Sequence, residues 1–303
     1  MSHPNTSIIV FAFNRPDHLG RTLHALAACP EAATSHVTIY CDGARRDSDA
    51  ERVAQVRAVA RAATGFAAVE VVERPKNLGL AASIIDGVTS QLAREERVIV
   101  LEDDIVVSPH FLRYMNDALE MYANDEQVAS IHGYVYPVAE PLPETFFLRG
   151  ADCWGWATWG RAWRHFRADG PALLAELRSR RLTRTFDLDG SYPYTRMLED
   201  QIAGRNNSWA VRWHATCFLR GMLTLYPGHS LVVNIGNDDS GTHSGMTSDY
   251  DVELRGHPVA LQRIEPAESA QATAAVARFF RSRRRAFVRR LARFVTRVVA
   301  RPA

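Results

Sequence analysis

Several features are scarce in this 303-residue sequence, and each absence excludes a class of protein. The four cysteines form no C-x-x-C pair, so their spacing indicates neither a zinc site nor a disulfide framework. No uncharged apolar run reaches the roughly 18 residues that a membrane-spanning helix needs. The first residues contain no cationic segment followed by an apolar run, so no signal peptide is predicted and a cytoplasmic location is expected.

Lysine is nearly absent, because Lys76 is the only one among 36 basic residues. The formal net charge of +2 also hides an asymmetry. Residues 278–301 contain ten arginines and no acid, which leaves 26 basic against 34 acidic residues in the rest of the chain. This acidic body argues against a nucleic-acid-binding protein. With 47% hydrophobic residues, the chain can still bury a sizeable core.

The arginine-rich end predicts a basic amphipathic helix. On a helical wheel its apolar face would carry Phe280, Phe287, Leu291, Phe294 and Val298. Such a helix is typical of a protein that binds an anionic membrane surface. Alternatively, the apolar face packs on the body of the protein and the arginines face solvent. Both interpretations stay open, and the membrane surface is preferred.

The first half of the chain alternates short apolar runs with segments of helical periodicity. Strands are expected over residues 7–13, 37–41, 69–72 and 97–101, and helices over 19–26, 53–59, 80–92 and 111–122. Continuous apolar strands that alternate with helices are typical of a parallel sheet covered on both faces. No G-x-G-x-x-G follows the first strand, so a standard dinucleotide-binding fold is not expected.

Polar residues follow each of these predicted strands. Because ligands of such sheets bind beyond the carboxyl ends of the strands, one polar cluster is expected there. Its members would be Asn14, Arg15, Asp42, Asn77, Glu102, Asp103 and Asp104. The three adjacent acids repel one another, and Mg²⁺ or Mn²⁺ would relieve that repulsion. The alternatives are an acidic cap for the next helix and, for Asn77, a plain turn residue.

The segment V-I-V-L-E-D-D-I-V-V-S-P-H-F-L at 98–112 resembles the metal motif of glycosyltransferases of the GT-A fold. It is especially similar to the N-acetylglucosaminyltransferase I group, whose form of the DxD motif is E-D-D. Residues 9–16 resemble the first strand and turn of family-2-type transferases. Residues 40–43 and 77–79 resemble the ends of the second and third strands.

Four tryptophans lie within residues 154–163, and the second half of the chain continues the resemblance from there. Gly155-Trp156 looks like the glycine-containing loop on the acceptor side. Residues 198–200 fit the x-E-D motif that carries the catalytic base, and His243 fits a C-terminal histidine that reaches the metal or phosphate. The resemblance covers roughly residues 6–245.

This resemblance implies an α/β, GT-A (Rossmann-like) nucleotide-sugar-binding fold. Its central sheet would be mostly parallel, and an acceptor-side subdomain and a C-terminal amphipathic helix would follow. The nucleotide-sugar-binding half would span residues 1–135, and the acceptor and catalytic half of the same domain would span 136–260. Residues 261–303 would form a linker and the basic helical tail.

The resemblance also implies roles for individual residues. Asp104 and His243 would hold Mn²⁺ or Mg²⁺. Asp200 would deprotonate the acceptor hydroxyl for in-line attack with inversion. Residues 237–244 would form a lid ordered by the donor, and Glu102 would orient the turn at the metal motif. The donor-binding residues would be Asn14, Arg15, Asp42, Asn77, Asp103 and Trp156, with at least two of the other tryptophans in the core.

A metal-dependent inverting glycosyltransferase is therefore expected. It would move a hexosyl or N-acetylhexosaminyl group from a nucleotide-diphosphate sugar to a glycan or lipid-linked acceptor. Surface glycan assembly at the inner face of a membrane is the expected setting, and no nucleic-acid partner is expected. Two alternatives remain. A sugar-nucleotide-forming nucleotidyltransferase usually has a glycine-rich basic loop that residues 13–17 lack. A noncatalytic carbohydrate-binding protein would leave the strand-end acids without a ligand.

Overall fold

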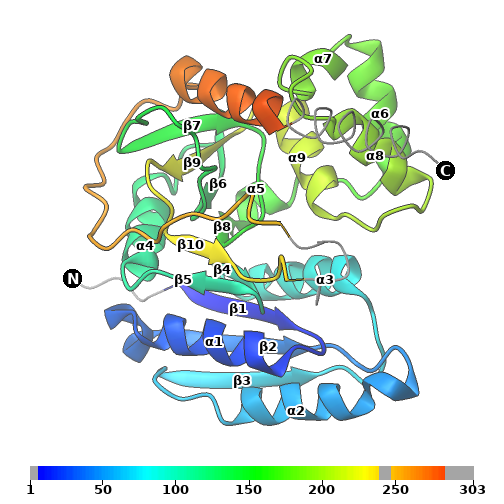
Figure 1. Cartoon of the computed structure of the whole chain (residues 1–303), viewed down its shortest axis with the longest axis vertical. Helices are drawn as coiled ribbons and strands as arrows, with labels where there is room; N and C mark the ends of the chain where they lie inside the picture. Colours follow the sequence, from blue (N-terminus) through cyan, green and yellow to red (C-terminus); the bar gives the residue numbers. More distant parts are fainter. Residues whose placement is uncertain (1–5, 239–246, 284–303) are drawn as a thin grey trace, which may run out of the picture.

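A computed structural model describes residues 6–238 and 247–283 of the chain. A mixed eight-stranded sheet organises these residues, with the strand order β3-β2-β1-β4-β8-β6-β9-β7 (Figure 1). Its first four strands are β1 (Ser7–Ala12), β2 (His36–Cys41), β3 (Ala68–Glu73) and β4 (Arg97–Glu102). The remaining strands are β6 (Val128–His132), β7 (Thr145–Arg149), β8 (Trp156–Trp159) and β9 (Leu223–Pro227). The expected α/β fold with a largely parallel sheet is confirmed.

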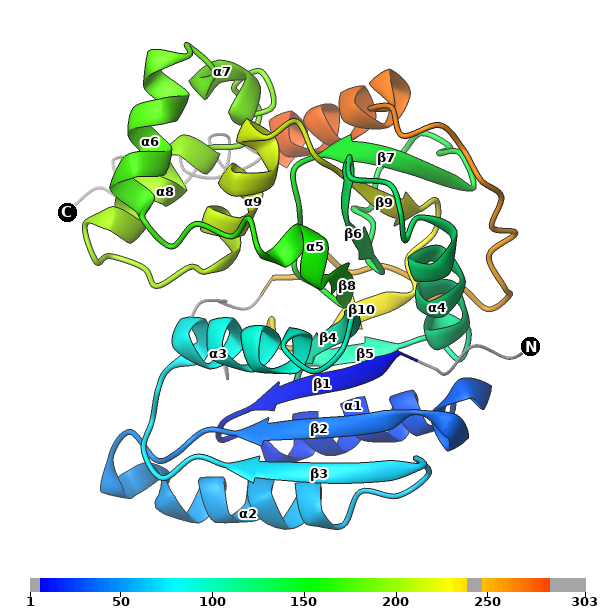
Figure 2. The ribbon, with the colours of Figure 1, turned by 180° about the vertical axis from the view of Figure 1, so that it is seen from behind.

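Helices connect the parallel strands and cover both faces of the sheet. They are α1 (Pro16–Ala27), α2 (Ala50–Arg61), α3 (Leu80–Leu92) and α4 (Phe111–Met121). Each strand and helix expected in this half is present, with bounds shifted by a few residues at most. Figure 2 shows α2 and α3 separated by the plane of the strands.

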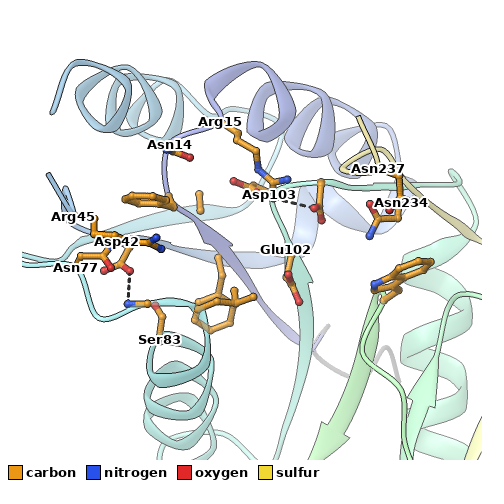
Figure 3. Close-up of a pocket in the computed structure, with 17 residues that line it drawn as sticks. Asn14, Arg15, Asp42, Arg45, Asn77, Ser83, Glu102, Asp103, Asn234 and Asn237 are labelled. Atoms are coloured by element: carbon orange, nitrogen blue, oxygen red, sulfur yellow. Dashed lines mark hydrogen bonds and ion pairs between the residues drawn. The ribbon is translucent and has the colours of Figure 1, made fainter. Parts of the chain in front are cut away.

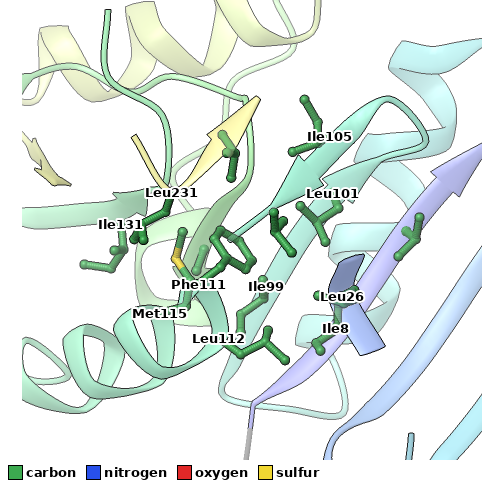
Figure 4. Close-up of a cluster of buried hydrophobic side chains, with 14 of the residues drawn as sticks. Ile8, Leu26, Ile99, Leu101, Ile105, Phe111, Leu112, Met115, Ile131 and Leu231 are labelled. Atoms are coloured by element: carbon green, nitrogen blue, oxygen red, sulfur yellow. The ribbon is translucent and has the colours of Figure 1, made fainter. Parts of the chain in front are cut away.

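Side-chain alternation along β1 divides the core into two layers. Ile8 and Val10 belong to one buried cluster, together with residues of α1, α2 and α4 (Figure 4). Ile9 and Phe11 belong to the other, which contains residues of α3 and four of the buried tryptophans, Trp156, Trp163, Trp209 and Trp213. Because alternate side chains of a strand point to opposite faces, an uninterrupted apolar run is what a sheet buried on both faces requires.

The parallel pairing fixes where the strand ends meet. β1 pairs in parallel with β2 and β4, and β2 pairs in parallel with β3, so their carboxyl ends share one edge. β8 runs antiparallel to β4 and brings its first residue, Trp156, opposite Val100. A separate two-stranded sheet of β5 (Ile105–Val107) and β10 (Val232–Asn234) places a late segment beside the turn that follows β4.

The second half of the chain adds a helical subdomain. Its helices are α5 (Gly160–Trp163), α6 (Gly170–Ser179), α7 (Thr183–Phe186), α8 (Tyr194–Ile202) and α9 (Ala210–Leu219). Residues of α6 to α9 share a separate apolar cluster, which contains Leu173, Leu198 and Phe218. In the described part of the chain, no helix has the length and apolarity to cross a membrane.

A helix over residues 270–283 lies beside β7 and is drawn in orange in Figure 1. Its buried Ala272 packs with Phe146 and Tyr226 of the sheet. Phe280 is 5% exposed, and its ring centroid lies 4.5 Å from that of Tyr192. The apolar face of this segment therefore packs on the body, which was the alternative interpretation. The rest of the predicted tail, including Phe287 to Val298, lies outside the described residues.

Candidate functional site

A cavity of about 270 Å³ opens at the edge where the parallel strands end (Figure 3). All seven residues predicted from strand ends line it: Asn14, Arg15, Asp42, Asn77, Glu102, Asp103 and Asp104. They come from turns as far as 90 positions apart in sequence, and parallel pairing brings them to one place. The expected polar cluster is thus a pocket wall.

Asp42 organises one side of this pocket. Its Oδ1 accepts hydrogen bonds from the backbone N–H groups of Gly43 and Leu78, and its Oδ2 accepts one from Gly79. Asn77 donates from its side chain to the carbonyl oxygen of Gly43 at 2.8 Å. Asp42 and Asn77 therefore hold the turns after β2 and β3 together. The positive φ of +74° at Gly79 lets the chain turn sharply into α3.

Arg15 lies at the end of the turn after β1, directly before Pro16 opens α1. Its Nη2 donates to Asp103 Oδ1 and, at 2.9 Å, to Asp104 Oδ2. Burial opposes its charge, but the attraction and hydrogen bonds of both carboxylates outweigh burial and raise the pKa of Arg15. One guanidinium thus links two neighbouring carboxylates at the carboxyl end of β4.

The three acids at the end of β4 lie next to one another, with Asp103 and Asp104 buried and Glu102 half-buried. Burial, followed by the charges of Asp104 and Asp103, raises the pKa of Glu102 well above its usual range. Burial also raises the pKa of Asp103, although Arg15 opposes this. Such shifts mean that the protein leaves the negative charges incompletely compensated. A ligand that carries positive charge would therefore be held strongly here.

The acidic turn fits a divalent cation on one observation in particular. Asp104 Oδ1 is buried and has no hydrogen-bond partner among the described residues, while Oδ2 of the same group pairs with Arg15. Mg²⁺ commonly takes one or two carboxylates and completes its shell with substrate phosphate oxygens and water. Among the described residues there is no group of three or more His, Cys, Asp and Glu side chains arranged to hold a metal by themselves. His243, the other predicted ligand, lies outside the described residues.

The segment after β10 lies directly over this turn. Ile235 donates its backbone N–H to Asp104 O at 2.9 Å, and His18 lies 3.3 Å from Ile235 O. Gly236 is so close that a Cβ there would lie 2.2 Å from Asp104 Oδ2. Asn234 and Asn237 of the same segment line the pocket (Figure 3). Most of the predicted lid, residues 239–244, falls outside the described residues.

The prediction for Trp156 is wrong. Its side chain is 1% exposed and packs against Trp209 and Trp213 in the core, because its position in β8 directs it to the α3 side of the sheet. Trp154, two residues earlier, lines the pocket instead. Trp159 and Trp163 are buried, as expected for core residues.

Asp200 does not line the cavity. It lies on α8, where Arg205 donates to its Oδ1 at 2.7 Å. The backbone N–H of Arg205 also donates to the carbonyl oxygen of Asp200 at 2.8 Å. The loop that follows reaches the pocket wall, because Asn207 Nδ2 is 3.9 Å from the position of a Cβ on Gly79. Asp200 is thus connected to the rim of the pocket through a short loop.

Several pocket residues were missed by sequence reasoning. Arg45, Ser83, Trp154 and Asn234 line the cavity and were not predicted there. Glu102 was predicted in the polar cluster, and Asn237 in the lid. The only sequence signal for Asn234 was its position after an apolar run, since β10 pairs with β5 only in the folded chain. Trp154 could have been found from the register, because continuing the β4–β8 pairing places it opposite Glu102.

A family model described as "Glycosyltransferase like family 2" matches residues 3–180. TarS of S. aureus is 16% identical with a TM-score of 0.32, over 46% of this chain and 23% of that one. The mannosyltransferase PcManGT from Pyrobaculum calidifontis, in complex with GDP-Man and Mn²⁺, is 13% identical with a TM-score of 0.41, over 72% and 70%. The galactosyltransferase LgtC is 12% identical with a TM-score of 0.34, over 58% and 64%.

The chain spans less than a quarter of the length of the TarS structure it matches. A comparison with curated proteins found no match.

Proposed function

Because the chain belongs to the family of glycosyltransferase like family 2 proteins, we propose that it transfers a sugar from a nucleotide-diphosphate donor to a hydroxyl acceptor. The observation that supports this most is the composition of the pocket at the carboxyl edge of the sheet. It joins a buried acidic turn, a guanidinium and a polar wall in one cavity. These are the groups needed to hold a nucleoside, a diphosphate and a cation together.

The wall formed by Asp42, Asn77 and Arg45 would receive the nucleoside. Asp42 is 4% exposed and already accepts three backbone hydrogen bonds, so it shapes this wall as much as it contacts a ligand. Arg45 lies over the ring of Phe13 at 5.7 Å, at the opening of the pocket. Asn14 and Arg15 would face the ribose and the diphosphate. The sugar would then point toward Trp154.

Asp103 and Asp104 would hold Mn²⁺ or Mg²⁺, with His243 as a further ligand. When bound, a divalent cation neutralises charge that develops on a departing diphosphate. The unpartnered Oδ1 of Asp104 supports this proposal. The segment at Gly236 would close over the donor and exclude water from the activated glycosyl bond.

Asp200 would act as the base that removes the proton of the acceptor hydroxyl, so that attack inverts the anomeric carbon. Both hydrogen bonds of the Arg205 guanidinium go to Oδ1, so Oδ2 would be the oxygen that takes the proton. The position of Asn207, whose Nδ2 lies 3.9 Å from where a Cβ on Gly79 would be, supports a coupling of this loop to the donor.

Release of nucleoside diphosphate from a panel of UDP- and GDP-sugars, in the presence of Mn²⁺ and hydroxyl acceptors, tests the proposed transfer. Asp104→Ala is expected to abolish release, because it removes a charge that the cation requires. Asp117→Ala changes an exposed acid on α4 and is the matched control. Equal release by the Asp104 variant and the unchanged chain would overturn the metal assignment.

The base assignment has its own test. Asp200→Asn is expected to keep donor binding and lose transfer, whereas Asp189→Asn, at an exposed acid before α8, keeps both. NMR of the first-formed product should show an inverted anomeric configuration. Full transfer by the Asp200 variant, or retention at the anomeric carbon, would reject Asp200 as the base.

We also propose that the acceptor is a glycan or a lipid-linked sugar and that the arginine-rich end brings the enzyme to an anionic membrane. The charge of residues 284–301 supports this, since seven of the ten arginines in 278–301 would remain for lipid if the 270–283 helix stays on the body. Flotation with anionic vesicles, comparing the full chain with one that ends at residue 283, tests it. Equal recovery of both would end the proposal.

A further inference from the structure

The guanidinium of Arg15 lies between the carboxylates of Asp103 and Asp104 and forms an ion pair with each. Its side chain is 15% exposed, and those of Asp103 and Asp104 are 5% and 11% exposed. Among the described residues, no other Lys or Arg forms an ion pair with the three acids after β4. The guanidinium is therefore their counter-ion in this structure.

The hydrogen bonds of this group are unevenly distributed. Arg15 uses one nitrogen, Nη2, for both carboxylates. Oδ2 of Asp104 accepts one of these hydrogen bonds, while Oδ1 of the same carboxylate is buried and finds no partner in the part of the chain that the structure describes. A bidentate guanidinium normally satisfies both oxygens of one carboxylate with two nitrogens. Arg15 instead spans two acids and leaves Oδ1 of Asp104 unused, whereas Asp103 also accepts a backbone hydrogen bond from Phe13.

The backbone around Arg15 also limits how it can move. Pro16 fixes the start of α1, so the Cα of Arg15 is anchored while its long side chain can change rotamer. A Cβ on Gly236 would lie 2.9 Å from Arg15 Nη1, so the segment after β10 closes the other side of the guanidinium. The open direction from this position is the cavity, which Arg15 itself lines.

We propose that Arg15 is an exchangeable counter-ion, which holds Asp103 and Asp104 until a divalent cation takes them and then turns to the diphosphate of the donor. The inference rests on the proposed function only in assigning a divalent cation to these two acids. A guanidinium and a divalent ion repel each other at contact distance, so both cannot use Asp104 Oδ2. Binding of the cation and release of Arg15 are then one step.

Two opposite consequences follow from this exchange. Without Arg15, the acids are uncompensated, and Mn²⁺ alone should bind more tightly because no cation has to be displaced. At the same time, a nucleoside diphosphate should bind more weakly in the presence of Mn²⁺, because its phosphates lose a cationic partner. A residue that only stabilises the fold would weaken both ligands together.

The experiment measures Mn²⁺ binding by electron paramagnetic resonance of the free ion, with no nucleotide present. Arg15→Gln is expected to increase Mn²⁺ affinity by about tenfold or more, which is the scale of removing one unit charge beside two buried carboxylates. Arg97→Gln removes a cation from the opposite end of β4, where Arg97 pairs with Glu120, and should leave Mn²⁺ affinity unchanged. Unchanged or weaker Mn²⁺ binding by Arg15→Gln would overturn the proposal.

Thermal unfolding supplies a second readout. Mn²⁺ should raise the melting temperature of Arg15→Gln more than that of the unchanged chain, because a ligand stabilises the folded state in proportion to its affinity. If Arg15→Gln does not fold without metal, Arg15→Lys keeps the charge in a shape that cannot span two acids. It should bind Mn²⁺ with an affinity between those of the other two proteins, and an affinity no greater than that of the unchanged chain would contradict the exchange.

The outcome separates this inference from the proposed function. Tighter Mn²⁺ binding by Arg15→Gln, with no sugar transfer from any donor, would support the exchange and reject the transferase. Donor turnover that persists in EDTA, with no Mn²⁺ bound by either protein, would support transfer and reject the exchange. Titration of both proteins with UDP and with GDP, in the presence of Mn²⁺, completes the test. Arg15→Gln must lower the affinity for at least the nucleotide that the unchanged chain binds more tightly.

Discussion

Nε2 of His132 lies 3.0 Å from the backbone nitrogen of Trp154 and accepts its hydrogen. Nδ1 of the same ring lies 2.9 Å from Tyr134 O. Because a carbonyl oxygen can only accept, Nδ1 carries the proton, and the two contacts require the neutral imidazole. His132 is fully buried at the end of β6, so it fixes the backbone of the tryptophan that lines the pocket.

This arrangement predicts a pH-dependent contribution to stability. Burial lowers the pKa of His132 from 6.5, so the unfolded chain binds a proton more readily than the folded one. The stabilisation by His132 is therefore complete above pH 6.5 and is lost as the pH falls toward the lower, folded pKa. His132→Gln should cost about 1–3 kcal/mol at pH 7.5, and its difference from the unchanged chain should shrink by pH 5.5.

Comparison of the two proteins is essential here, because the buried acids after β4 act in the opposite sense and are common to both. Urea unfolding at a series of pH values gives the difference in unfolding free energy directly. His257→Gln, at an exposed histidine, is the control and should show a constant difference. A constant difference for His132→Gln as well would contradict the prediction.

Gly236→Ala should impair the site without unfolding the protein. The added methyl group would lie 2.2 Å from Asp104 Oδ2, so the segment after β10 or the carboxylate has to move. A shift of this size at a catalytic centre can lower transfer by roughly tenfold or more. Gly256→Ala, where no atom lies within 4 Å of the new Cβ, should leave donor turnover unchanged. Equal turnover by both variants would show that the Gly236 segment is not required.

Asp42→Asn should destabilise the turns after β2 and β3. An amide has a single acceptor oxygen, so it cannot replace the carboxylate toward both Leu78 and Gly79, and its NH₂ would face a backbone N–H. We expect a loss of about 2 kcal/mol in unfolding free energy, together with weaker donor binding. Asp47→Asn, at an exposed acid, should change neither. An Asp42→Asn variant of unchanged stability would show that the Asp42 carboxylate is not needed to hold the turns after β2 and β3 together.

Trp154 and Trp156 should respond differently to truncation. Trp156→Ala empties a fully buried position and should cost about 3–5 kcal/mol in unfolding free energy. Trp154 is half-buried and lines the cavity, so Trp154→Ala should lower donor or acceptor affinity with a smaller loss of stability. Thermal unfolding and donor binding of both variants check this. If Trp156→Ala lowered ligand affinity more than Trp154→Ala and cost less stability, Trp156 would be the tryptophan that contacts the ligand.

Much of the architecture could be predicted from local sequence pattern. The run Ile8 to Phe11 is apolar at every position because a strand buried on both faces needs it, and the structure places these residues in two different core layers. The polar residues at the strand ends, from Arg15 to Asp104, could be expected in one pocket, because parallel strands end at a common edge.

The tertiary structure alone decided which groups face one another within that pocket. Arg15 meets Asp103 and Asp104 because of long-range strand pairing, and so does Gly236, which lies against the Asp104 carboxylate. Which tryptophan lines the cavity, Trp154 or Trp156, depends on the direction of each side chain. Local periodicity carries neither. Trp154 and Trp156 are two positions apart and would share a face of a regular strand, but β8 begins only at Trp156 and Gly155 before it has a φ of +62°. Contacts across 88 or 132 positions are created only when the strands assemble.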